Sequence, residues 1–64
     1  MVLTKEKALE YDKEHRGRLL VEWDDETMNW GVFGSESGFC YETFETESLA
    51  EEFEEEKNKE WFQR

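Results

Sequence analysis

The sequence has no proline, one cysteine, one histidine and only four glycines among its 64 residues. The lone Cys40 excludes an internal disulfide, and Cys40 with His15 falls short of the four ligands that a structural zinc site requires. No apolar run approaches the ~20 residues needed to span a bilayer, and charge follows the first apolar residues too soon for a signal peptide. These absences predict a protein of the reducing cytoplasm that carries no metal or other cofactor.

Basic residues are also scarce. Eight Lys and Arg stand against eighteen Asp and Glu, which gives a formal net charge of −10. Such a chain repels the phosphates of nucleic acid and the headgroups of an anionic membrane, so neither is expected as a direct ligand. The expected partner is another protein, and the oligomeric state is left open by the sequence.

Aromatic residues, by contrast, are abundant. Three Trp, two Tyr and five Phe make up 16% of the chain, and each such side chain can bury about 150–250 Å². A chain of this length buries only about 60% of the surface that unfolding exposes. The aromatic side chains therefore favour folding over disorder, although 41% of the residues are charged. We expect a single domain over residues 1–64.

Two helices are predicted from capping residues and from apolar side chains at helical spacing. Thr4 is a suitable N-cap for the first helix, and Gly17 is suited to the left-handed position that ends it. Ser48 and Glu51 form the pattern of a capping box before the second. The apolar stripe of the second helix is expected to face the core and comprises Leu49, Ala50, Phe53 and Trp61. The predicted helices span residues 5–16 and 48–63.

Between the helices the apolar period changes to two, which is the period of a strand. Polar segments at residues 24–27 and 34–38 separate the alternating stretches and have the composition of hairpin turns. The sequence thus predicts an α+β domain of order αβββα, with two helices packed on one face of a three-stranded antiparallel meander. The predicted strands span residues 18–24, 28–33 and 39–44.

Residues with catalytic chemistry are few and lack supporting groups. Cys40 and His15 are a nucleophile and a base, but the sequence indicates no residue to orient the base and no oxyanion pocket. Asp24 and Glu26 suggest the start of a calcium loop, yet such a loop ends on a glutamate where this chain has Ser35, and it lacks the internal glycine. We therefore expect a protein that is not an enzyme.

The second predicted helix carries an acidic face, which is the most unusual feature of the sequence. Like-charge pairs four residues apart on this face each cost about 0.2–0.5 kcal/mol of helix stability. Alternating Lys and Glu would have stabilised the helix instead, so solubility alone does not require the pattern. The alternative is that Glu is a good helix former and the face is simply solvated. The face consists of Glu47, Glu51, Glu52, Glu54, Glu55 and Glu56.

The functional interpretation is that these carboxylates stand where a nucleic-acid-binding protein expects phosphates. Residues four apart on a helix are separated by about 6 Å of rise, close to two phosphate steps of ~3.4 Å along one strand. Apolar anchors usually supply affinity at the centre of such a contact, and Phe62 is the candidate on this helix, with Leu20, Phe33 and Phe44 on an open sheet face. The predicted partner-binding residues are Glu47, Glu51, Glu52, Glu54, Glu55, Glu56, Phe62 and the turn acids Asp24, Asp25 and Glu26.

In size, charge and mixed α/β order, the chain resembles the small acidic proteins by which phages and mobile elements block host nucleic-acid enzymes, which include anti-CRISPR proteins and other DNA mimics. The resemblance implies an inhibitor that occupies the basic nucleic-acid channel of a host protein, and it carries over no functional residue. A second hypothesis is a cytoplasmic adaptor or regulatory subunit that binds through the apolar sheet face. A third, resting on Cys40 and His15, is a small enzyme subunit completed by a partner.

Overall fold

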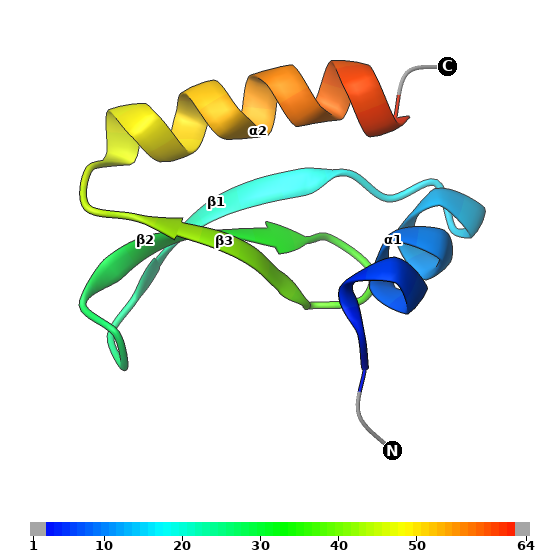
Figure 1. The fold of residues 1–64 in the computed structure, drawn as a ribbon, viewed down its shortest axis with the longest axis horizontal. Helices are drawn as coiled ribbons and strands as arrows, with labels where there is room; N and C mark the ends of the chain where they lie inside the picture. Colours follow the sequence, from blue (N-terminus) through cyan, green and yellow to red (C-terminus); the bar gives the residue numbers. More distant parts are fainter. Residues whose placement is uncertain (1–2, 63–64) are drawn as a thin grey trace.

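The structure, a computed structural model, describes residues 3–62 and has the predicted order αβββα. Each end of a helix or strand lies within two residues of its predicted position, which is the usual uncertainty of such boundaries. Residue 63, the predicted last residue of the second helix, lies outside the described residues. The elements are α1 (Lys5–Glu14), β1 (Leu19–Asp24), β2 (Asn29–Gly34), β3 (Cys40–Phe44) and α2 (Glu47–Phe62) (Figure 1).

The three strands form an antiparallel meander in the order β1-β2-β3, so β1 and β3 are both edge strands. Strand β1 pairs with β2 without interruption, from Leu19 opposite Gly34 to Asp24 opposite Asn29. The pairing of β2 with β3 shifts between Val32 and Phe33, which marks a β-bulge. This confirms the α+β class that the change of hydrophobic period predicts.

The two helices occupy different positions against the sheet. Helix α2 runs across one face and contacts all three strands, whereas α1 contacts β2 and lies at the end of the sheet beside the β2–β3 turn (Figure 1). Helix α2 begins at the opposite end of the sheet, the end that also carries the β1–β2 turn. Helix α2 faces β1 on one side, through Asn58, and β3 on the other, through Phe53 and Trp61. These contacts place its acidic residues relative to the sheet.

The buried core differs from the predicted stripe of α2. Leu49 is 48% exposed, whereas Phe62 is only 9% exposed and belongs to the core. The inward face of the helix is thus rotated away from Leu49, because it must also include Asn58, which bonds to β1. Phe53 and Trp61 pack partly buried against the core, as the stripe predicts. The fully packed residues are Ala8, Leu19, Val32, Tyr41, Ala50 and Phe62.

Phe44 also departs from its predicted place on the open face of the sheet. Its ring centroid lies 5.4 Å from that of Phe53, so the side chain is on the side covered by α2. Tyr41 lies on the same side, 5.8 Å from Trp61. Strict alternation would put Tyr41 and Phe44 on opposite faces. The bulge makes Tyr41 the extra residue between Cys40 and Glu42, which breaks the alternation and brings both side chains to the helix.

The ends of the helices combine predicted and unexpected residues. The Thr4 side chain accepts a hydrogen bond from the Lys7 N–H at 3.3 Å, which confirms it as the N-cap of α1. Helix α2 begins one residue before Ser48 and is capped instead by Thr46, whose hydroxyl accepts from the Leu49 N–H at 3.3 Å. Thr46 and Ser48 both carry a hydroxyl that can accept from a helix N–H. The N-cap therefore lies two residues earlier than predicted but works in the same way.

In the turn after α1, Gly17 does not take the left-handed conformation expected for it. Arg16, not Gly17, has a positive φ of 57°. Gly17 is required for a different reason, because a Cβ there would stand 2.9 Å from the Ser35 side chain and 3.1 Å from the Asp12 carbonyl oxygen. Its N–H donates to that carbonyl at 2.6 Å. The glycine therefore permits close packing of the turn against the end of the sheet.

Candidate functional site

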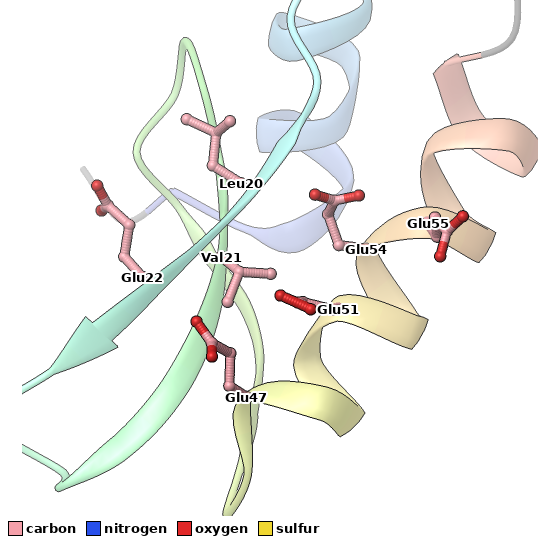
Figure 2. Close-up of a pocket in the computed structure, with 7 residues that line it drawn as sticks. All are labelled: Leu20, Val21, Glu22, Glu47, Glu51, Glu54 and Glu55. Carbon is pink, nitrogen blue, oxygen red and sulfur yellow. The ribbon is translucent and has the colours of Figure 1, made fainter.

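The acidic residues of α2 lie on two sides of the helix. One group faces β1 across a groove of about 560 Å³. Figure 2 shows β1 in front, with Val21 directed toward α2 and with Leu20 and Glu22 directed to the other side of the strand. The groove is lined by Leu20, Val21 and Glu22 of β1 and by Glu47, Glu51, Glu54 and Glu55 of α2.

Asn58 fixes the distance between α2 and the start of β1. Its Oδ1 accepts from the Leu19 N–H at 2.8 Å, and its Nδ2 donates to the Leu19 carbonyl at 3.3 Å. The same Nδ2 donates to Glu54 Oε1 at 3.2 Å, one helical turn earlier. The side chain therefore imitates a strand partner for one residue of β1 and holds Glu54 beside the groove.

The other acidic group is on the outer side of α2. Glu52, Glu55, Glu56 and Glu60, together with Lys59, line a shallow depression there. Glu55 borders both this depression and the groove. The six glutamates predicted as one outward face are thus divided between a groove against β1 and an open helix surface.

Little of the negative charge is neutralised within the described chain. Within residues 3–62 the only ion pair joins Lys57 to Glu60, at 3.1 Å. Lys59 forms none with Glu55. Lys57 and Lys5 also lie over the Trp61 ring, each 5.4 Å from its centroid, and so are directed toward the aromatic core. Glu47, Glu51 and Glu55 therefore present free carboxylates at the groove.

The acids of the β1–β2 turn are partly used to form the turn. Asp24 accepts from the Glu26 N–H and from the Thr27 hydroxyl, both at 3.1 Å. Asp25 accepts from the indole N–H of Trp23 at 2.6 Å. Glu26 is exposed. These contacts stabilise the hairpin, and they leave Glu26 as the turn acid whose side chain has no such role.

The predicted apolar anchors are less accessible than expected. Phe62 is buried, so the prediction that it lies outside the core is wrong, and Phe44 lies under α2. Leu20 and Phe33 do pair on the face away from α2 and are half-buried. The Phe33 ring lies over Gly31, where an added Cβ would stand 2.6 Å from it. Part of that apolar face is therefore covered by Phe33 itself.

Cys40 and His15 have separate surroundings in the structure. Burial raises the pKa of the Cys40 thiol, and the nearby carboxylate of Asp24 raises it further, which disfavours the thiolate. The His15 ring stacks on Tyr11 at 4.1 Å, and its Nδ1 lies 3.0 Å from the Tyr11 carbonyl oxygen. Neither contact is that of a nucleophile with its base.

The sequence reasoning missed Asp12, which is fully buried. Its Oδ1 accepts from the N–H groups of Glu36 and Ser37 at 3.0 and 2.8 Å. Its Oδ2 accepts from the hydroxyls of Ser37 and Tyr41, both at 2.7 Å. Burial by itself raises the pKa of the carboxyl, but these bonds outweigh it and the pKa is lowered. The available signal was the position of Asp12 one helical turn after Ala8, on the inward face.

Within residues 3–62 there is no cluster of three or more His, Cys, Asp or Glu side chains arranged to hold a metal ion. No helix in the described part is both long enough and apolar enough to cross a bilayer. No protein-family model matches the chain, and no curated protein or solved structure is significantly similar to it.

Proposed function

We propose that this protein is a non-enzymatic binding module of the cytoplasm that occupies the basic nucleic-acid-binding surface of a partner protein, as a DNA mimic does. In such a complex, the carboxylates of α2 take the place of phosphates. Inhibition of the partner follows because nucleic acid and this protein compete for the same basic surface. Phages and mobile elements are sources in which such inhibitors of host defence, anti-CRISPR proteins among them, are expected.

The observation that carries the proposal is the unbalanced charge of α2. Three of its glutamates, Glu47, Glu51 and Glu55, are exposed and make no ion pair with any described residue. They stand at successive four-residue intervals, about 6 Å apart along the helix axis. A row of free carboxylates with this spacing attracts a basic surface and accelerates its association.

The test compares two variants with the same change of charge. In the first, Glu47, Glu51 and Glu55 are replaced by Gln, and Glu54 is kept because it accepts a bond from Asn58. In the control, Glu6, Glu10 and Glu14, which are exposed on α1, are replaced by Gln. A partner captured from lysate is titrated with each protein at low and high salt, with and without duplex DNA or single-stranded RNA.

We expect the α2 variant to lose affinity by at least about tenfold, which corresponds to ~1.4 kcal/mol, while the α1 variant binds nearly as the wild type does. Salt should weaken the wild-type complex because it screens charges beyond about 8 Å at physiological ionic strength. Nucleic acid should displace the protein from its partner. Binding that ignores both salt and nucleic acid would refute the proposal.

A second candidate function is that of an adaptor or regulatory subunit that binds through the uncovered sheet face. Leu20 and Phe33 form a cross-strand pair there and are half-buried. In this case Leu20→Ser should abolish the complex, whereas the α2 variant should retain it and salt should have little effect. The same titration therefore separates the two functions.

A further inference from the structure

The two edges of the sheet differ in how their backbone groups are satisfied. Exposed edge strands invite pairing with another chain, and proteins commonly protect them with bulges or local hydrogen bonds. Strand β3 is protected in both ways. Its pairing with β2 is interrupted by a bulge, and the Thr43 N–H donates to the carboxylate of the preceding residue, Glu42, at 3.2 Å.

Strand β1 lacks this protection over most of its length. Residues of an antiparallel strand alternate between pointing their N–H and C=O groups toward the neighbouring strand and away from it. Both groups of Leu19 bond to Asn58, so they point away from β2. The next outward-facing groups belong to Val21 and Trp23, and no described residue outside the sheet bonds to them.

The open part of the edge lies beside the acidic groove. Val21 contributes to the groove together with Glu47, Glu51 and Glu54 of α2, and in Figure 2 the Glu47 and Glu51 carboxylates stand next to Val21. The register of β1 with β2 is regular over all six residues. Regular backbone, unpaired donors and acceptors, and a row of carboxylates thus lie together in one place.

We propose that β1 binds an extended basic segment of the partner as a fourth strand of the sheet. The backbone of that segment pairs with the N–H and C=O groups of Val21 and Trp23, in the manner of strand addition. Its Lys or Arg side chains on the helix-facing side meet Glu47, Glu51 and Glu54, and its alternate side chains lie beside Leu20. Asn58 bounds the site at Leu19, where the backbone groups are already bonded.

This inference rests on the proposed function, since it names the segment of the basic partner that the acidic groove receives. The charge also decides against a second copy of this chain as the occupant. Two β1 edges placed together would bring the glutamates of both grooves, and two chains of net charge −10, against each other.

The probe is a synthetic ten-residue peptide of alternating Lys and Thr, which favours extended backbone and places all of its lysines on one face. Its control is the same peptide methylated at its backbone nitrogens, so it carries the same charge but lacks the N–H donors of a strand. We expect the Lys–Thr peptide to bind at least about tenfold more tightly, because two or more backbone hydrogen bonds separate the two. Equal affinities would mean that only charge is recognised, which would overturn strand addition and leave the proposed function standing.

A pair of variants locates the peptide on the protein. Proline is tolerated in an edge strand where its nitrogen faces outward, so Val21→Pro should remove the donor of β1 without breaking its pairing with β2. Thr43→Pro makes the matched change on β3. We expect Val21→Pro to lower the affinity for the Lys–Thr peptide about tenfold and Thr43→Pro to leave it unchanged. The reverse order would place the site on the wrong edge.

Amide hydrogen exchange on the wild-type protein tests whether the peptide binds along β1, even if Val21→Pro does not fold. Addition of the Lys–Thr peptide should slow exchange at Val21 and Trp23 and leave Thr43 unchanged. No protection at Val21 and Trp23, or no binding of the peptide at all, would overturn the inference. Protection that appears without peptide as protein concentration rises, together with a doubled mass in sedimentation, would assign the edge to self-association instead.

Discussion

At the scale of single residues, Asp12 connects three parts of the chain that are distant in sequence. It belongs to α1, and its carboxylate accepts hydrogen bonds from the β2–β3 turn and from Tyr41 of β3. Gly34 makes room for it, since a Cβ at that position would overlap the carboxylate. A buried carboxylate with this many donors holds α1 at the end of the sheet.

The first prediction concerns the substitution Asp12→Asn. An amide cannot accept from all of the present donors, so we expect the variant to lose about 2–4 kcal/mol of unfolding free energy. Asp25→Asn, in the exposed turn, should change it by less than about 0.5 kcal/mol. Urea denaturation followed by tryptophan fluorescence measures both. Equal losses in the two variants would show that Asp12 does not anchor α1.

The lowered pKa of Asp12 gives this anchor a pH dependence. A carboxyl whose pKa is lower in the folded than in the unfolded state stabilises the fold above its unfolded value, and the stabilisation is lost as the pH falls through the folded value. The wild type should therefore lose this contribution below about pH 4. Asp12→Asn should show a smaller loss of stability over the same range.

The second prediction concerns the rotated face of α2. Phe62 is buried and Leu49 is half-exposed, so Phe62→Ala should cost about 3–5 kcal/mol and Leu49→Ala less than about 1 kcal/mol. The helical wheel drawn from the sequence predicts the opposite order. Thermal unfolding of the two variants distinguishes them, and a larger loss for Leu49→Ala would restore the face predicted from the sequence.

At the scale of elements, the attachment of α2 to β1 depends on one amide side chain. Asn58 bonds both backbone groups of Leu19, and Leu19 is fully buried. The backbone of α2 is helical on both sides of Asn58, so the helix does not depend on this contact for its own formation. It fixes the position of α2 relative to the edge strand and thereby the width of the groove.

The third prediction is that Asn58→Ala loosens this contact. The unpaired N–H and C=O of Leu19 should cost about 1–3 kcal/mol, and amide exchange at Leu19 should accelerate while exchange in the middle of β2 changes only with global stability. Lys59→Ala, the neighbouring exposed position, provides the control. Unchanged exchange at Leu19 would mean that Asn58 does not close the edge.

At the scale of the whole molecule, the net charge of −10 works against the fold. The described chain contains the Lys57–Glu60 ion pair, and the remaining acids repel one another through solvent. Salt screens this repulsion over distances greater than about 10 Å at 0.1 M. Unfolding the chain increases the distances between the charges, so the repulsion is larger in the folded state.

The fourth prediction is that added NaCl stabilises the protein. We expect Tm to rise by about 5 °C between ~20 mM and ~500 mM salt, which corresponds to roughly 1 kcal/mol for a domain of this size. The variant with Gln at Glu47, Glu51 and Glu55 should start from a higher Tm at low salt and respond less. A Tm that falls with salt would indicate that attractive pairs outweigh the repulsion.

The sequence by itself determined the order and type of the elements, the positions of the two hairpin turns and the acidic character of α2. These properties follow from local patterns: the period of the apolar residues, the hydroxyl N-cap at Thr4 and the polar turns. Leu20 and Phe33 were predicted on one face and are paired there, because the β1–β2 register is regular.

Only the tertiary structure decided which side chains those elements bury and where the acidic surface is divided. A one-residue bulge brought Phe44 under α2, and the bonds of Asn58 to Leu19 belong to an inward face of the helix that includes Phe62. Both depend on contacts between residues far apart in the chain, and a periodic pattern contains no information on such contacts. The groove beside β1 also depends on the tertiary structure, because it forms only where the edge of β1 and the glutamates of α2 lie side by side.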